Sequence, residues 1–139
     1  MSKLTTKHLG DAGEYYALSQ FIFWELAASK MPDNWPNYDL VVELNDDLKK
    51  ISVKTRATSK DKFSTEHCKF SNNDIFDFLV CIFKARENIW SWVLPRDVAM
   101  ELGKVANSRD INYRRISFKQ LNALGLYQNN WVLESLENV

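Results

Sequence analysis

The order of apolar and polar residues predicts a long helix at the start of the chain. Over residues 5–29, apolar side chains recur three or four positions apart, at Leu18, Phe21, Ile22 and Leu26. Glu14 lies on the same stripe, so its carboxylate should project toward the core side. A half-buried carboxylate is costly unless a positive group meets it, and a divalent metal or a lysine would do so. The alternative is a solvated acid in the first turns of a helix, where the helix dipole favours negative charge.

A period of two replaces the helical period after the proline-containing loop at residues 31–37. Residues 38–44 and 51–57 both alternate, and the polar turn at residues 45–47 separates them, which predicts a β-hairpin. The apolar positions form one face of this hairpin, while Asp39, Ser52 and Lys54 lie on the other face. The hairpin therefore gathers its polar chemistry on one surface.

Two further strands are predicted in the second half of the chain. Residues 76–83 are almost continuously apolar, as in a central strand that is covered on both faces. Residues 89–94 form a neighbouring strand in which Trp90 and Trp92 point the same way, either into the core or toward stacked bases. A short strand is also expected near residues 67–70.

Short helices complete the pattern. Pro95 and Gly103 bound one of them, and the capping-box spacing of Ser117 and Gln120 begins another, which should stop at Gly125. Residues 131–133 add a last edge strand or a packed tail. This order of elements predicts an α/β sandwich around a mixed sheet.

Composition and charge limit the class of protein. The 139 residues, 45% of them apolar, fit a single domain over residues 1–139. Eighteen basic and eighteen acidic residues cancel, so nucleic-acid binding must come from a local patch. We place the loop at residues 58–73 beside a substrate. The stretch at residues 104–115 holds the densest basic cluster, which either contacts phosphate or is a solvated surface. The candidate nucleic-acid-binding residues are Arg56, Lys60, Lys62, Arg114 and Arg115.

Other sequence features exclude several classes. No run approaches the roughly twenty apolar residues of a membrane span, so we expect a soluble cytoplasmic protein without a membrane partner. Cys68 and Cys81 are too few for a disulfide framework and should be free thiols. Two histidines and the lack of a glycine-rich phosphate loop argue against a zinc site and nucleotide chemistry.

Three short segments carry a resemblance to a known family. They are Gly10-Asp11-Ala12-Gly13-Glu14, Tyr38-Asp39-Leu40-Val41-Val42 and Ile51-Ser52-Val53-Lys54-Thr55. Their order resembles the core of the PD-(D/E)XK nuclease superfamily, which includes Holliday-junction resolvases and many restriction-type endonucleases. The resemblance covers roughly residues 8 to 98. It implies a restriction-endonuclease-like mixed β-sheet of about four to five strands flanked by helices, with Mg²⁺ or Mn²⁺ as the cofactor.

The resemblance also implies roles for the site residues. Asp39 would be the principal metal ligand, Glu14 would complete the site directly or through water, and the backbone carbonyl of Val53 would be a further ligand. Lys54 would orient the attacking water or stabilise the transition-state charge. Ser52 stands where the family usually has glutamate or glutamine. Its hydroxyl can bind a metal or the metal's water, but it brings no negative charge.

Two functions follow from these residues. The first is a metal-dependent nuclease that acts on nucleic acid, foremost DNA, with a homodimer through the Trp90 and Trp92 strand or the C-terminal tail as one arrangement. The second is a catalytically inactive nuclease-like fold that binds another protein, such as an inhibitor or immunity protein for a toxin. The plain alternative is an unrelated α/β domain in which Asp39 begins a strand and Lys54 is a surface charge.

Overall fold

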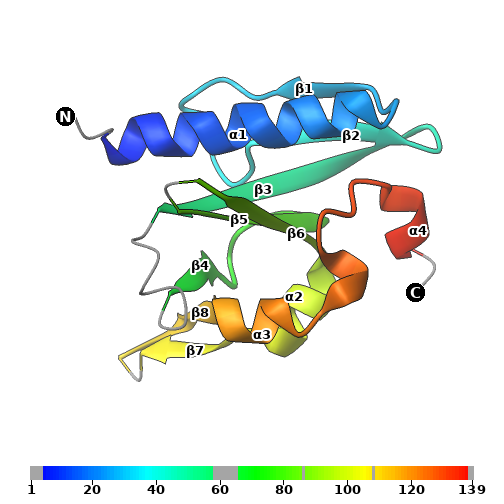
Figure 1. Cartoon of the computed structure of the whole chain (residues 1–139). Coiled ribbons are helices and arrows are strands. Elements are labelled where there is room, and N and C mark those ends of the chain that lie inside the picture. The colour runs from blue at the N-terminus through cyan, green and yellow to red at the C-terminus, as the bar shows by residue number, and fades with distance from the viewer. Residues whose placement is uncertain (1–4, 58–65, 86, 108, 138–139) are drawn as a thin grey trace.

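The longest strand of the chain, β3 (Asp47–Ala57), lies in the middle of a five-stranded sheet, the main sheet (Figure 1). The strand order is β1-β2-β3-β5-β6. These strands are β1 (Ala28–Lys30), β2 (Leu40–Leu44), β5 (Phe78–Lys84) and β6 (Ile89–Pro95). β3 and β5 run parallel, whereas the other neighbouring pairs are antiparallel. The predicted mixed sheet of four to five strands is confirmed.

In the computed structural model, residues 5–57, 66–85, 87–107 and 109–137 are described. Lys60 and Lys62 lie outside the described residues, as does the first half (residues 58–65) of the loop that we placed beside a substrate.

The predicted hairpin joins β2 to β3. Asn45 and Asp46 have positive φ angles of 53° and 66°, and Leu44 pairs directly with Asp47. A two-residue loop of this kind is a type I′ turn, which matches the twist of the two strands and which Asn and Asp tolerate better than most residues. The turn sets the register that carries Asp39 past the end of the β2–β3 ladder.

Helix α1 (Thr6–Phe23) is shorter than the helix predicted over residues 5–29. It ends where the Leu26 N–H donates to the Phe21 carbonyl and the Glu25 N–H donates to the Ile22 carbonyl, with Glu25 at a φ of 65°. This is the Schellman arrangement, and the chain then turns into β1. Leu26 fitted the helical pattern of apolar residues although it lies beyond the helix, because it packs against the core from the turn.

Gly13 allows α1 to lie directly on β3. A Cβ atom at this position would stand 1.8 Å from the Thr55 hydroxyl oxygen, a distance that no real contact reaches. Ala17 and Phe21, one and two turns further along, are buried on the same face of the helix. One helix therefore covers one face of the main sheet, and its approach depends on a missing side chain.

A second, three-stranded sheet, the small sheet, lies on the other side of the main sheet (Figure 1). Its order is β4-β8-β7, with β4 at His67–Ser71, β8 at Asp110–Ser117 and β7 at Lys104–Asn107. The sequence predicted β4 but assigned no strand to residues 104–115. The alternation of apolar and polar residues is not recognisable in β8, because a charged residue, Arg114, lies on the inner face beside buried Ile116. An apolar residue, Ile111, lies on the outer face and is 67% exposed.

Two buried thiols lie in contact between the main sheet and the small sheet. The Sγ atoms of Cys68 on β4 and Cys81 on β5 are 3.0 Å apart, and both side chains are buried. Both are free thiols, as predicted.

The short helices pack around the small sheet and the end of the main sheet. Helix α2 (Arg96–Leu102) ends with Gly103 at its C-cap, as predicted. Helix α3 (Phe118–Asn122) begins with the predicted capping box but stops before Gly125. Of the edge strand or packed tail predicted at residues 131–133, the packed tail is correct: Trp131 and Leu133 are buried, and helix α4 (Leu133–Glu137) follows.

The two tryptophans of β6 belong to the interior. Trp92 is fully buried, and its ring meets Phe83 and Phe118 edge to face. Trp90 packs against Phe118 on the same side. The core interpretation is therefore correct, and the enclosed Trp92 cannot contribute to a homodimer interface or stack on a base.

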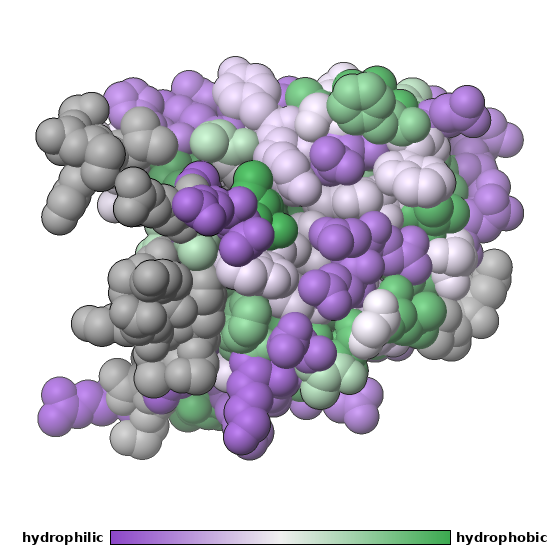
Figure 2. Space-filling view, in the orientation of Figure 1, coloured by the Kyte–Doolittle hydropathy of each residue, from purple (hydrophilic) through white to green (hydrophobic). Residues whose placement is uncertain are grey.

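Hydrophilic and apolar residues are interspersed on the surface in the orientation of Figure 1. Figure 2 shows scattered hydrophilic patches among weakly polar residues, and an apolar area over the C-terminal end of α1, where Ile22, Phe23 and Trp24 are exposed. Among the described residues, no helix combines the length and the apolar content needed to cross a membrane.

Candidate active site

Asp39 lies at the point where β2 begins, between β1 and β3. Its N–H donates to the Ile51 carbonyl at 2.8 Å, and its carbonyl accepts from the Met31 N–H at 2.9 Å. Its carboxylate oxygen Oδ2 accepts from the Val53 N–H at 2.8 Å. Among the described residues, no group donates to the other oxygen, Oδ1. One carboxylate oxygen is therefore fixed by the fold, and the other is available to a ligand.

The backbone of Val53 points toward the same place. In an extended strand, the N–H and C=O groups of one residue project to the same side. Because the Val53 N–H meets Asp39, the Val53 carbonyl also faces the edge where the β2–β3 ladder ends. The sequence resemblance named this carbonyl as a metal ligand, and its direction fits that role.

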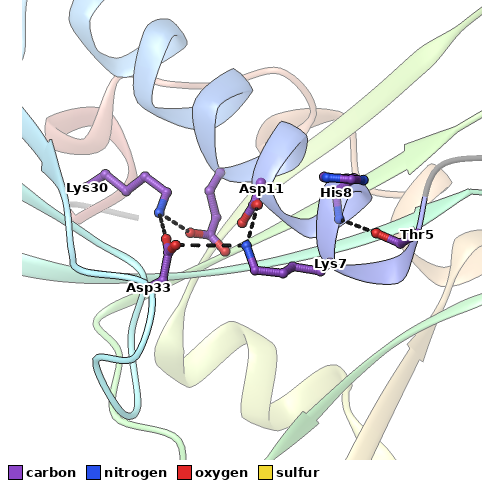
Figure 3. Close-up of polar contacts among 7 residues, drawn as sticks. Thr5, Lys7, His8, Asp11, Lys30 and Asp33 are labelled. Carbon is purple, nitrogen blue, oxygen red and sulfur yellow. Dashed lines mark hydrogen bonds and ion pairs between the residues drawn. The ribbon is translucent and has the colours of Figure 1, made fainter.

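Glu14 reaches the Asp39 region from α1. Both side chains lie on the walls of a pocket of about 230 Å³ between α1 and the loop before β2, which we call the carboxylate pocket. Asp11 and Asp33 also line it. Figure 3 shows Asp33 between Lys30 and Lys7, whose Nζ atoms lie 2.9 Å and 3.8 Å from its carboxylate oxygens.

The electrostatics of the pocket oppose two ionised acids. Burial raises the pKa of Glu14, and the charge of Asp39 raises it further, while Lys30 lowers it. Burial also raises the pKa of Asp39, against the Val53 hydrogen bond and the charge of Lys54. The fold therefore holds the two carboxylates together at a free-energy cost, which a bound cation would remove.

Lys54 lies beside Asp39 but not in the carboxylate pocket. Its Nζ is 3.8 Å from Asp74 Oδ2, and its side chain is 35% exposed. Its charge is close enough to lower the pKa of Asp39. The structure thus brings Glu14 and Asp39 into one pocket and places Lys54 on the adjoining, small-sheet side of β3.

Ser52 differs from the prediction of an open polar face. Ser52 is only 2% exposed, because β3 is covered on both faces at this point. The hydroxyl is therefore enclosed beside Leu79 of β5, its neighbour in the strand register. A site at Asp39 draws its negative charge from Asp39 and Glu14, not from position 52.

Sequence reasoning missed Lys30. Its Nζ lies 3.4 Å from Glu14 Oε1, and Asp33 accepts a hydrogen bond from it, which is the main cause of the raised pKa of Lys30. The residue ends β1, a three-residue strand whose first two residues fell within the predicted helix at residues 5–29. A strand this short carries no periodic signal, so the sequence offered no indication of this lysine's position.

The predicted nucleic-acid-binding residues have different surroundings. Arg56 lies 3.8 Å from Glu66 across an ion pair. Arg114 is turned inward, where its guanidinium donates to Asn72 Oδ1 at 2.5 Å and to the Gly103 carbonyl at 3.0 Å. Arg115 is exposed on the outer face of the small sheet. Arg114 is thus used to hold the end of α2, and Arg115 is available to solvent.

The donor set fits a hard cation. Within the described part of the chain, no three His, Cys, Asp or Glu side chains are grouped to hold a metal. Two carboxylates and a carbonyl are nevertheless oxygen ligands of the type that Mg²⁺ and Mn²⁺ take, and Mg²⁺ commonly keeps several waters. The free Oδ1 of Asp39 and the costly pairing with Glu14 meet this requirement.

The fold is shared with a homing endonuclease of known structure. A bacterial homing endonuclease, I-Ssp6803I, superposes with a TM-score of 0.64 and 20% sequence identity over 97% of this chain and 96% of that chain. Archaeoglobus fulgidus Hjc, a Holliday junction resolvase from an archaeal hyperthermophile, superposes with a TM-score of 0.48 and 8% identity over 78% of this chain and 91% of that chain. No family model and no curated protein matches the sequence. The restriction-endonuclease-like fold that the PD-(D/E)XK resemblance implied is confirmed by the homing endonuclease.

Proposed function

We propose that the protein is a metal-dependent nuclease that hydrolyses phosphodiester bonds in DNA. The observation that carries the proposal is the carboxylate pocket, which Glu14 and Asp39 line from separate elements. Burial raises the pKa of both acids, and the charge of Asp39 raises the pKa of Glu14 further. Perturbed acids in a pocket are typical of functional sites. The fold shared with a homing endonuclease favours the same function.

Each residue of the candidate site has a defined role in this proposal. Bound Mg²⁺ or Mn²⁺ would polarise the scissile phosphate and lower the pKa of the attacking water. Asp39 would hold the ion through Oδ1, with the Val53 carbonyl beside it and Glu14 in direct or water-mediated contact. Two carboxylates would supply all of the negative charge, so we expect weaker metal binding than with a third acid at Ser52.

Lys54 would act on the substrate. A fixed ammonium group near the phosphoryl oxygens stabilises the negative charge that develops in the transition state. Asp74, 3.8 Å from Lys54 Nζ, would keep this ammonium in place.

A cleavage assay tests the proposal. Supercoiled plasmid, a four-way DNA junction and a structured RNA are incubated with the protein in Mg²⁺, Mn²⁺ or EDTA. We expect cleavage of a DNA substrate in metal and none in EDTA. Asp39→Asn and Lys54→Met should each reduce the rate by about 100-fold or more, since each removes charge that acts on the reacting groups.

Matched changes at the far end of the hairpin serve as controls. Asp47→Asn and Lys49→Met make the same chemical changes in residues that pair with each other at 3.2 Å, away from Asp39. They should leave cleavage unchanged. Equal losses in all four variants, or cleavage that survives Asp39→Asn, would exclude the carboxylate pocket as the active site.

Ser52 favours a second candidate, an inactive nuclease-like fold that binds a toxin or another protein. The position that usually supplies an acid or amide holds a buried hydroxyl instead. This candidate predicts no heat of Mn²⁺ binding by calorimetry and no cleavage of any substrate. Metal binding together with cleavage would reject it.

A further inference from the structure

The outer face of the small sheet carries a row of cations that is set by the strand register. Arg115 on β8 pairs with Lys69 on β4 and with Lys104 on β7. Directly paired residues point to the same face of a sheet, and neighbouring strands are about 4.8 Å apart. Three positive side chains therefore stand side by side across three strands, all of them exposed.

This arrangement is unfavourable for the protein alone. Like charges directly opposite each other destabilise a sheet. Among the described residues, no carboxylate lies within ion-pair distance of Lys69, Lys104 or Arg115. The Lys69 ammonium instead lies over the Tyr113 ring, 4.6 Å from its centroid. As far as the structure describes the chain, the row therefore lacks the anionic partners that Lys7, Lys30 and Lys49 have.

The row also borders a hollow. A pocket of about 610 Å³ lies between the outer face of the small sheet and α3, and its walls include Lys104, Arg115, Lys119 and His67. None of the described residues that line it is acidic. Lys119 is exposed and likewise has no carboxylate partner in the described part of the chain. In a chain of net charge zero, this is a marked local excess of positive charge.

We propose that this surface, the cationic face (Lys69, Lys104, Arg115 and Lys119), binds the phosphate backbone of nucleic acid outside the scissile step. The inference rests on the proposed nuclease function and adds a binding region remote from the carboxylate pocket, on the far side of the main sheet from α1 (Figure 1). A line of ammonium and guanidinium groups can neutralise successive phosphates along a nucleic-acid strand. Such contacts add affinity and salt dependence but no sequence preference.

The test measures binding without cleavage. Fluorescence anisotropy of a labelled DNA duplex is recorded in EDTA over a range of salt concentrations, for the full chain and for the variant Lys104→Gln/Arg115→Gln. We expect the double variant to bind about tenfold more weakly at moderate salt. The slope of log K against log salt should become shallower by about 2, because two phosphate contacts are lost.

A second variant with the same loss of charge controls for net charge. Lys49→Gln/Lys84→Gln removes two lysines from the main sheet and should change the affinity and the slope little. Circular dichroism melts confirm that both variants are folded. Equal losses of affinity in the two variants would overturn the cationic face. An unlabelled poly-glutamate chain that competes as well as unlabelled duplex would also overturn it, because an acidic protein partner would then explain the surface.

Failure of this inference and failure of the nuclease proposal give different results. Cleavage by the wild type together with unchanged binding by Lys104→Gln/Arg115→Gln would reject the cationic face and keep the nuclease. Weakened binding by that variant, in a protein that cuts nothing in Mg²⁺ or Mn²⁺, would support the cationic face and reject the nuclease. A wild type that binds no duplex at low salt would reject the cationic face.

Discussion

At the scale of single residues, Asp39 combines a structural and a chemical task. Its N–H, its carbonyl and its carboxylate each make a hydrogen bond to a different residue, yet burial raises its pKa. The sequence resemblance named Asp39, Glu14 and Lys54, because the family motif marks them. It could not name Lys30, since that side chain reaches Glu14 only through the pairing of an unpredicted strand.

We expect Asp39→Asn to raise the melting temperature in the absence of metal. The amide oxygen can keep the Val53 hydrogen bond while the unfavourable charge is removed. The folded-state pKa of Asp39 is raised above 3.8, so protonation of Asp39 favours the folded state. This contribution to the free energy of unfolding is lost as the pH rises through the folded-state pKa. The gain should therefore be absent in strong acid and reach a few degrees at neutral pH, as measured by thermal melts from pH 3 to 8.

Asp39→Ala is the matched comparison. It removes the same charge but leaves the Val53 N–H without its acceptor, so it should be less stable than Asp39→Asn at every pH. An Asn variant that melts below the wild type at neutral pH would contradict the free-energy cost that we assign to the Asp39 charge.

We expect Ser52→Glu to destabilise the metal-free protein by about 1 to 3 kcal/mol. Position 52 is 2% exposed, and the longer acid would be buried close to Asp39. Mn²⁺ should raise the melting temperature of this variant by more than it raises that of the wild type, because the added carboxylate is a third ligand. Ser52→Gln separates size from charge. An equal response of both variants to Mn²⁺ would show that the added charge does not reach the ion.

At the scale of elements, the sequence predicted those whose signals are local. The two-residue turn at Asn45 and Asp46 and the Gly103 cap of α2 depend on residues that are adjacent in the chain. β1 and the β7–β8 hairpin were missed, since β1 has three residues and Arg114 interrupts the apolar face of β8. Tertiary packing decides those elements, and a single sequence does not display it.

The contact of α1 with β3 gives a prediction at this scale. Gly13→Ala should destabilise the protein by about 1 to 3 kcal/mol, because its Cβ would overlap the Thr55 hydroxyl and force the helix outward. Gly10→Ala is the control, since a Cβ there meets nothing within 4 Å, and it should be neutral or stabilising by up to about 1 kcal/mol. Urea unfolding measures both. Equal effects would refute the close contact.

β1 gives a second prediction through Lys30. An ammonium group 3.4 Å from Glu14 repels an incoming divalent cation, so Lys30→Met should lower the Kd for Mn²⁺ severalfold at neutral pH. Lys7→Met is the comparison, because Lys7 pairs with Asp11 and Asp33 rather than Glu14 and should have a smaller effect. Calorimetry measures both constants. Weaker binding by Lys30→Met would instead make Lys30 a supporting part of the site.

At the scale of the whole molecule, the balanced composition conceals a separation of charge. Eighteen acids cancel eighteen bases, yet the carboxylate pocket and the cationic face lie on opposite sides of the main sheet. Composition gave the single value of zero and could not reveal this, because the separation arises from strand order and register. The fold class, in contrast, was accessible from periodicity and the family resemblance together.

Metal binding should be coupled to the stability of the whole chain and to pH. Mn²⁺ binds the ionised acids, so protons compete with it below the raised pKa values of Glu14 and Asp39. We expect Mn²⁺ to raise the melting temperature more at pH 7 than at pH 5. Calorimetric scans at both pH values, with Ca²⁺-free buffer and EDTA as references, measure the difference. A larger rise at pH 5 would place the ion elsewhere.

The close approach of α1 to β3 at Gly13 has a consequence for which ion the protein selects. Glu14 is the next residue along the helix, so the spacing between α1 and β3 also sets how far one carboxylate stands from the other. Mg²⁺ demands short, nearly ideal bonds, whereas Ca²⁺ accepts longer ones. Gly13, which binds no ion itself, would thus influence which ionic radius the site accepts. Adding one methyl group at this position should increase the spacing between α1 and β3 and shift the preference toward the larger ion.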